Sequence, residues 1–324
     1  MNTKYNRITA DPQISDRLSD AISKAVGLTI PEDIPHGDMP GDKIEIGESH
    51  ISKARTIILE LIQHLIKAAG SNPYGRATIA VCGGSGVGKS EIASVLSYML
   101  TQSGIGSYIM SGDNYPHRIP SANDEERLHI FREGGVRAMA GAHKCTPEAI
   151  DALRKLQASD DDANESHKEE YDWFAGYFEG GKDALNNYLG TPAETDFDEV
   201  DSILSAFLDG ADALMFRRMG RDESSLWYDE IDLTKVQVLI LEWTHGNSDY
   251  MMNVDIPILL NSTPEETLEH RRSRNRDGKL DSPFTTLILN LEQDKLRSQA
   301  HKAKIIITKS GELINYETYE QMMK

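Results

Sequence analysis

Cysteine and long apolar runs are the two features that this 324-residue chain most lacks. Its only cysteines, Cys82 and Cys145, are too few for the disulfide framework of a secreted domain, so we expect a reducing, cytoplasmic environment. No stretch approaches the ~18 consecutive apolar residues of a membrane-spanning helix. The polar N-terminal stretch also lacks the apolar core of a secretion signal. We therefore expect neither secretion nor a membrane span.

Basic residues are also in short supply. The chain has 34 lysines and arginines against 52 aspartates and glutamates, which gives a net charge of −18. A surface this acidic repels nucleic-acid backbones and anionic lipid, so we expect neither nucleic acid nor a membrane as the main partner. The hydrophobic content of 39% is a globular value, and the length allows one large domain or two ordinary ones. The sequence does not set the oligomeric state, so a homo-oligomer stays open.

What the chain does contain is a complete G-x-x-x-x-G-K-[ST] phosphate loop. The loop is preceded by an apolar strand pattern at Ala77–Cys82 and followed by a helix pattern at Lys89–Gln102. The predicted nucleotide-binding residues are Gly83, Gly84, Ser85, Gly86, Val87, Gly88, Lys89 and Ser90. Strand, glycine loop and helix in this order favour a binding site over a plain glycine-rich turn that binds nothing.

The chemistry of this loop predicts ATP and Mg²⁺ as cofactors. Glycines allow backbone N–H groups to turn inward around phosphate oxygens, and the helix N-terminus adds partial positive charge. We expect Lys89 to reach the β- and γ-phosphates and the Ser90 hydroxyl to ligate Mg²⁺.

Strand patterns alternate with helix patterns on both sides of a long middle segment. This alternation predicts a P-loop NTPase of three α/β/α layers with a mostly parallel sheet, a helical insertion and an N-terminal helical extension. The expected strands are Ala77–Cys82, Ser107–Ser111, Val236–Glu242, Ile256–Asn261 and Lys304–Thr308. Helices are expected at Pro264–Arg276 and Thr285–Ala303.

Four parts of the chain differ in composition. Residues 1–75 read as a loosely structured extension with a short helix near Ile14–Val26 and an amphipathic helix over Ser52–Ala69. Residues 76–120 and 236–324 form the two parts of the predicted kinase core. Residues 121–235 are acidic, rich in helix patterns and poor in strand patterns, and we expect them to cover the active site and select the substrate. Their aromatic cluster around Tyr171–Phe178 is more typical of core than of a ligand platform.

Ligands of such folds bind at the carboxyl ends of the parallel strands, so the residues after each strand carry the chemistry. Asp113 follows the second strand, where it is our candidate general base, although it could instead hold Mg²⁺ through water or bond its own turn. The candidate substrate contacts around it are Tyr115, His117 and Arg118. Glu242 closes the third strand and is a candidate for orienting Mg²⁺ through water or binding substrate hydroxyls, with His245 as a further substrate contact.

An arginine cluster stands out on this acidic chain, with four arginines in the six residues 271–276. A helix dipole explains one or two cations at a helix end, but not four. Arg272 and Arg276 share one face at i and i+4, and we expect them to act as lid residues that stabilise the charge on the transferring phosphoryl group.

With these residues in hand, the chain resembles the phosphoribulokinase/uridine kinase family of phosphate-loop kinases. The resemblance lies in Gly83–Ser90, in Gly112-Asp113-Asn114-Tyr115, in Leu241-Glu242 with Gly246, and in Arg276-Asp277. The family usually has Gly directly after the strand-end Glu, where this chain has Trp243. The resemblance implies ATP-dependent phosphorylation of a hydroxyl, with Asp113 as the base and Arg276 in the lid.

Three functions stay open from sequence. The first is a kinase of a small hydroxylated metabolite, such as a sugar phosphate, a nucleoside or a small acid. The second is a nucleotide-dependent ATPase or switch that acts through protein partners, and the third is a binding module that kept only the fold. A GTPase would need [Asn/Thr]-Lys-x-Asp, and Thr308-Lys309-Ser310-Gly311 lacks the Asp. Retention of Lys89, Ser90 and Asp113 favours the first.

Overall fold

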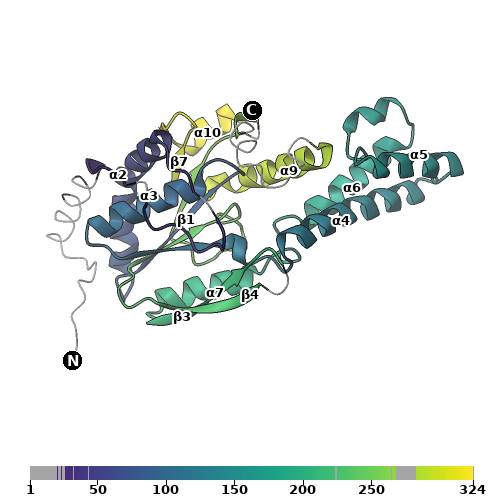
Figure 1. The fold of residues 1–324 in the computed structure, drawn as a ribbon. Coiled ribbons are helices and arrows are strands. Elements are labelled where there is room, and N and C mark those ends of the chain that lie inside the picture. The colour runs from purple at the N-terminus through teal and green to yellow at the C-terminus, as the bar shows by residue number, and fades with distance from the viewer. Residues whose placement is uncertain are drawn as a thin grey trace. The chain divides into compact units, whose positions relative to one another are not determined.

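Two compact units make up the chain in the computed structural model (Figure 1). The residues described are 26–31, 33–42, 44–222, 225–263, 265–267 and 282–323, together with 20 and 23. Unit 1 takes its residues from Met1–Tyr115, Phe197–Thr263 and Leu296–Lys324. Unit 2 takes its residues from Pro116–Asp196 and Pro264–Lys295.

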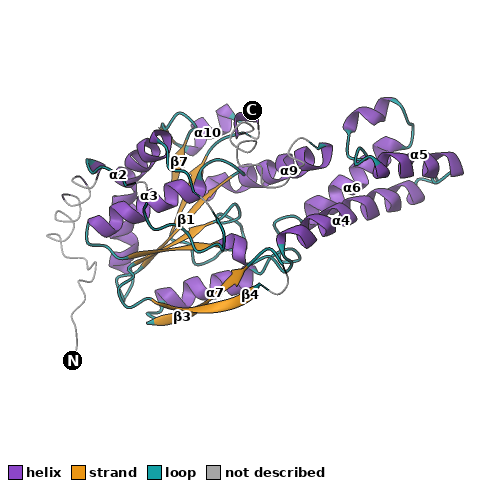
Figure 2. Ribbon diagram, viewed as in Figure 1, coloured by secondary structure: helices purple, strands orange, loops and turns teal. Residues whose placement is uncertain are grey.

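A mostly parallel six-stranded sheet forms the centre of unit 1 (Figure 2). Its strands are β1 (Ala77–Gly83), β2 (Ser107–Ser111), β5 (Val238–Glu242), β6 (Ile256–Leu260), β7 (Ile305–Ile307) and β8 (Leu313–Ile314). Their order is β2-β5-β1-β6-β7-β8, and every neighbouring pair is parallel except the antiparallel pair β7–β8. The mixed α/β class with a mostly parallel sheet is therefore confirmed.

Helices α2 (Glu48–Ser71) and α3 (Lys89–Gln102) cover one face of this sheet. Ile57, Leu61 and Leu65 recur at helical spacing along α2 and are fully buried. They belong to one core with alternate strand residues such as Ile79 and Ile240. Burying such side chains stabilises the fold by roughly 1.5–3 kcal/mol each, and this burial fixes α2 and α3 against the sheet.

The opposite face is covered in two parts. Over β2 and β5, Leu239 and Leu241 pack with α7 (Phe197–Leu208). Over β1, β6 and β7, Cys82 and Leu259 pack with Leu296 and the C-terminal elements η3 (Ala300–Lys302) and α10 (Tyr316–Met322). Cys82 is fully buried, and burial raises the pKa of its thiol to about 12, as expected for a small core side chain.

The order of the strands in the sheet reverses at β1, and this sets where a ligand can bind. The connection from β1 to β2 runs through α3 on one face of the sheet. The connection from β6 to β7 ends with Leu296 and Ala300, which lie on the other face. A reversal of this kind leaves a crevice at the carboxyl ends of the central strands. The phosphate loop follows β1 at this edge.

An antiparallel hairpin, β3 (Ala213–Met219) with β4 (Leu226–Asp232), lies in the stretch that we expected to be helical. Phe216 packs in the core with α7. Strand β4 is mostly exposed, and its sequence lacks the alternation of apolar and polar residues that marks a half-buried strand, so periodicity gave no signal. Contacts with residues far away in the chain hold the two strands in place. One of these contacts is a hydrogen bond of 3.0 Å from the Met219 N–H to the Asn114 side-chain oxygen.

Unit 2 is helical in its described residues. Its elements are α4 (Pro120–Gly141), α5 (Pro147–Ala158), η2 (Glu165–Glu169), α6 (Phe174–Tyr188) and the first part of α9 (Pro283–Gln299). The aromatic cluster is core, as expected: Phe131, Phe174 and Tyr177 are fully buried. Glycines allow α4 and α6 to approach closely, since a Cβ on Gly180 would lie 2.4 Å from that of Ala138.

Part of the predicted N-terminal extension packs against the rest of unit 1. Val26, Ile30 and the buried Ile34 pack against the α2–α3 core. The expected helix near Ile14–Val26 lies mostly outside the described residues, and so does most of Pro264–Arg276. Within the described ranges, no helix has the length and apolar character needed to span a bilayer.

Candidate nucleotide and acceptor site

The phosphate-loop residues join β1 to α3 in the order that the sequence predicts. Helix α3 begins at Lys89, so the N–H groups of its first turn face the loop without helical partners. The Lys89 ammonium donates a hydrogen bond to the Gly84 carbonyl at 3.2 Å. The charge therefore lies over the loop, where phosphate oxygens would be attracted to it.

Two glycines make this loop sterically feasible. Gly88 has φ of +92°, and a Cβ there would lie 2.9 Å from the His50 ring at the start of α2. Gly83 passes so close to β6 that its Cβ would lie 2.7 Å from the Leu260 carbonyl oxygen. Larger residues would strain both positions, so the motif requires glycine for backbone reasons as well as for anion binding.

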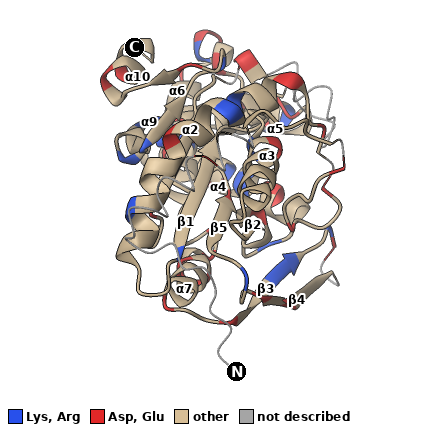
Figure 3. Ribbon diagram, turned by 90° about the vertical axis from the view of Figure 1, so that its left-hand side faces the viewer, with Lys and Arg blue, Asp and Glu red and all other residues tan. Residues whose placement is uncertain are grey.

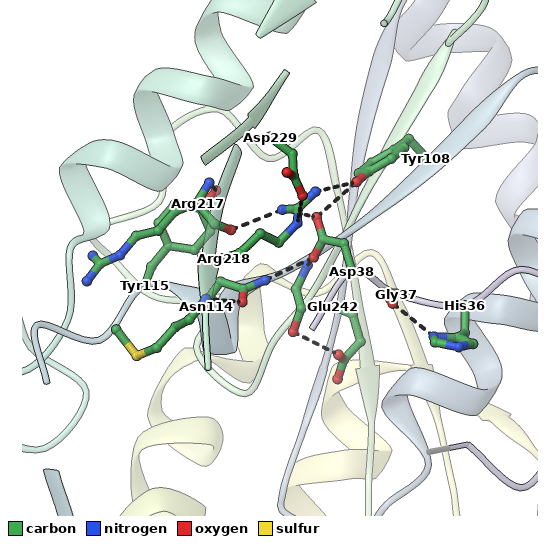
Figure 4. Close-up of polar contacts among 12 residues, drawn as sticks. His36, Gly37, Asp38, Tyr108, Asn114, Tyr115, Arg217, Arg218, Asp229 and Glu242 are labelled. Carbon is green, nitrogen blue, oxygen red and sulfur yellow. Dashed lines mark hydrogen bonds and ion pairs between the residues drawn. The ribbon is translucent and has the colours of Figure 1, made fainter. Parts of the chain in front are cut away.

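Glu242 lies at the carboxyl edge of the sheet, between its neighbours in register, Ser111 on β2 and Val81 on β1. It is 6% exposed, and the Ser111 hydroxyl donates to its Oε2 at 3.5 Å. Figure 4 shows this contact beside a polar network from the hairpin.

The environment of Glu242 joins it to the phosphate loop. Burial raises its pKa to about 7, and the nearby charges of Asp113 and Asp42 add to the increase. The Lys89 charge and a hydrogen bond from Ser90 act in the opposite direction. Lys89, Ser90, Asp113 and Asp42 are therefore each close enough to Glu242 to interact with it, so Glu242 links the predicted metal, nucleotide and base residues.

Asp113 is exposed, and its neighbours on both sides are buried. It lies in the single 3-10 turn η1 (Gly112–Asn114) that follows β2, and the Tyr115 N–H closes this turn on the Gly112 carbonyl. A carboxylate that projects from a fixed turn can reach a ligand without movement of the backbone. This geometry suits a general base.

Trp243 stands where the kinase family that the sequence resembles usually has glycine. A Cβ on Gly112 would lie 2.1 Å from the Trp243 ring, so the indole occupies the space that the glycine leaves beside Asp113. Trp243 is 2% exposed and packs against Phe197 and His245, with ring centroids 4.9 and 5.3 Å away. His245 is thus held by aromatic rings and remains partly exposed.

The structure distributes the other predicted substrate residues unevenly. Tyr115 is fully buried, and its hydroxyl accepts from the Arg217 N–H at 3.3 Å, so in this arrangement it is a packing residue rather than a surface for substrate. His117 and Arg118 belong to unit 2, where they bond the Pro192 carbonyl and the Tyr188 hydroxyl. Positions 272 and 276, like the rest of the arginine cluster, lie outside the described residues.

Sequence reasoning missed three charged residues at this edge. Asp38 and Asp42 come from the N-terminal segment that we expected to be loosely structured, and Arg218 comes from the unexpected hairpin. Asp38 and Arg218 form an ion pair of 2.8 Å whose side chains are only 8% and 6% exposed. No local pattern marks them, because they meet only through contacts between segments far apart in the chain. Figure 3 shows the basic stretch on β3.

The residues present fit a magnesium nucleotide. No group of three or more His, Cys, Asp or Glu side chains in the described ranges could hold a metal alone. Mg²⁺ that binds with a nucleotide needs only one or two carboxylates, because phosphates and waters complete its shell. The Ser90 hydroxyl and the Glu242 carboxylate supply such oxygens beside Lys89, and a bound cation would favour the charged form of Glu242.

Comparisons with known proteins give one strong sequence match. Over 261 residues, 81% of this chain, it is 35% identical to the bifunctional α-galactosidase/sucrose kinase AgaSK of Mediterraneibacter gnavus. The chain spans 22% of that protein's length. No family model matches the chain, so membership of the phosphoribulokinase/uridine kinase family stays a prediction.

A search of solved structures finds a provisionally named fructose transport system kinase from Silicibacter sp. TM1040. It covers 74% of this chain and 90% of its own chain, with 16% identity and a TM-score of 0.40. Both values are too low to support a statement about fold or function.

Proposed function

We propose that this chain is a P-loop kinase that uses Mg²⁺ and ATP to phosphorylate a hydroxyl group of a small carbohydrate. One observation carries the proposal: Lys89 and Ser90, at the start of α3, and the exposed Asp113 all lie close enough to the buried Glu242 to act on its carboxyl group. This combination provides a cation for phosphate, oxygens for Mg²⁺ and a base for a hydroxyl at one edge of the sheet.

Each residue has a role in this proposal. Lys89 neutralises phosphate charge, and Ser90 with Glu242 holds Mg²⁺ directly or through water. ATP supplies the phosphoryl group, and Mg²⁺ offsets the negative charge of its phosphates. Asp113 accepts the proton of the attacking hydroxyl, which makes that oxygen a better nucleophile. Arg272 and Arg276 remain proposed lid residues.

The name of the sequence relative favours a carbohydrate acceptor. That protein combines an α-galactosidase with a sucrose kinase, and this chain matches only part of it. Glycoside hydrolysis needs two carboxylates that flank a sugar bond, whereas a phosphate loop is built for nucleotides. We therefore assign the kinase activity to the matching region and propose a neutral sugar in place of the wider acceptor range left open by sequence.

The remaining organisation is part of the same proposal. Residues 76–120 and 236–324 contribute the kinase core, and 121–235 select the acceptor. We propose cytoplasmic action on ATP and a small molecule, without nucleic acid or membrane.

The direct test is acceptor-dependent formation of ADP. The purified chain is incubated with Mg²⁺ and ATP, alone and with a panel of sucrose, fructose, sugar phosphates and nucleosides. The proposal predicts that a neutral sugar stimulates ADP release and that removal of Mg²⁺ abolishes it. ADP release at the same rate without any acceptor would instead identify an ATPase or switch.

A further inference from the structure

The Asp38 carboxylate is the point where the N-terminal segment meets the turn that carries Asp113. It lies in a stretch without helix or strand, over residues 33–39, that crosses the carboxyl end of β2. Its two oxygens face different elements of unit 1 (Figure 4). The contacts of each oxygen indicate what Asp38 does.

Oxygen Oδ1 accepts hydrogen bonds from one residue before Asp113 and one residue after it. It accepts from the Ser111 N–H at 2.8 Å and from the Asn114 amide at 3.1 Å. The other end of the Asn114 side chain accepts from the Met219 N–H. The turn that carries Asp113 is therefore tied both to the N-terminal segment and to the hairpin.

Oxygen Oδ2 binds the hairpin and the strand beneath it. It accepts from the Tyr108 hydroxyl at 3.1 Å and pairs with Arg218 at 2.8 Å. Arg218 also contacts Asp229 on β4 at 3.1 Å. A buried ion pair of this kind adds little net stability, because desolvation offsets the attraction, so specific placement is its better-supported use.

The same segment continues toward the nucleotide side. Asp42 lies close enough to Glu242 to raise its pKa. Farther along, the ring of His50 packs against Gly88 in the phosphate loop. The N-terminal segment therefore contacts the turn that carries Asp113 and also passes beside the phosphate loop.

We propose that Asp38 is a positioning residue, which fixes the turn that carries Asp113 and links it through Arg218 to the β3–β4 hairpin. The expected loss of kcat rests on the proposed function, whereas the expected loosening of the turn does not. Asp38 itself does not need to touch substrate. Its role is to hold the base at a set distance from the loop, and a misplacement of about 1 Å can lower a rate roughly 100-fold.

The first test is hydrogen–deuterium exchange without ATP or sugar. In Asp38→Ala, exchange in the peptide containing Ser111–Tyr115 should rise well above the wild-type rate. Asp38→Asn keeps one oxygen for this turn, so its increase should be smaller. Asp255→Ala is the matched control, because Asp255 accepts from the Thr78 N–H and hydroxyl at the opposite end of the sheet. It should leave the peptide unchanged.

The second test is kinetic. Asp38→Ala should lower kcat roughly 100-fold with little change in the KM for ATP, and Asp255→Ala should not. If Asp38→Ala fails to fold because Arg218 is left without its buried partner, Asp38→Ala/Arg218→Met removes both charges and should show the same increase in exchange. Unchanged exchange at Ser111–Tyr115 in a folded Asp38 variant overturns the proposal, as does a kcat loss equal to that of the Asp255 variant. Inactive wild-type protein would refute the proposed function, whereas the exchange result would still decide the positioning role.

Discussion

At the scale of single residues, Lys89 carries the charge on which the nucleotide site depends. Its ammonium lies over the loop and donates to the Gly84 carbonyl. Lys89→Ala should lower phosphoryl transfer at least about 100-fold, because a charge-assisted contact to the transferring group is lost. The fold should be unaffected, which circular dichroism would check.

Lys302→Ala provides the control for that variant. Lys302 forms an ion pair of 2.7 Å with the exposed Asp249. Surface pairs of this kind contribute little, so its activity should stay near that of the wild type. Undiminished transfer in Lys89→Ala would refute the nucleotide assignment.

Asp113 should matter for chemistry more than for nucleotide binding. Asp113→Asn keeps the shape of the side chain but cannot accept the proton, so kcat should fall roughly 10²–10⁴-fold. ATP affinity, measured by calorimetry, should change little. If affinity collapses while kcat persists, Asp113 is a metal ligand or a structural residue instead of the base.

At the scale of elements, the α4–α6 pair depends on the small size of its glycines. A Cβ at Gly180 would lie 2.9 Å from the Gly134 carbonyl oxygen and 2.4 Å from the Ala138 Cβ. Gly180→Ala should therefore destabilise unit 2 by about 1–3 kcal/mol through overpacking.

Gly176→Ala tests the same helix without the clash. Nothing lies within 4 Å of a Cβ at Gly176. Alanine is the better helix former, so this variant should gain roughly 0.5–1 kcal/mol. Denaturant unfolding of both variants gives the comparison, and equal effects would mean that α4 and α6 do not pack this closely.

The turn η2 contains a pH-sensitive contact. The His167 ring lies 2.7 Å from Asp161 and 2.9 Å from Glu170. Burial disfavours the charged ring, but the hydrogen bonds to the two carboxylates outweigh it and raise the pKa of His167 above 6.5. The stabilisation is therefore complete below pH 6.5 and is lost as the pH rises through the raised value.

This sign predicts a pH-dependent cost of His167→Gln. The difference in Tm between wild type and variant should be larger near pH 6 than near pH 8.5. Differential scanning fluorimetry at several pH values would measure it. A difference independent of pH would show that the folded ring does not titrate with a raised pKa.

The elements that sequence predicted well are those with local signals. Helix Lys89–Gln102 and strand Ser107–Ser111 have the expected bounds, because apolar periodicity and flanking glycines define them. The β3–β4 hairpin carries charged residues on an exposed strand, and contacts with the Asp113 turn hold it in place. Tertiary contacts of this kind leave no periodic pattern.

At the scale of the whole molecule, the candidate site has a predictable part and a hidden part. Glu242 and Asp113 could be expected together because parallel strands end at the same edge. Asp38 could not, since its partners Tyr108 and Arg218 are separated from it by 70 residues or more along the chain. The acceptor also could not be predicted, because it depends on regions that match no family pattern.

The transfer of labelled phosphate tests the central claim most directly. The wild-type chain is incubated with Mg²⁺ and ATP labelled at the γ-phosphate, with sucrose as acceptor, and the products are separated. Our account predicts that the label appears on the sugar and that Asp113→Asn suppresses this product. Label found only in inorganic phosphate, at a rate that no sugar in the panel changes, would contradict it.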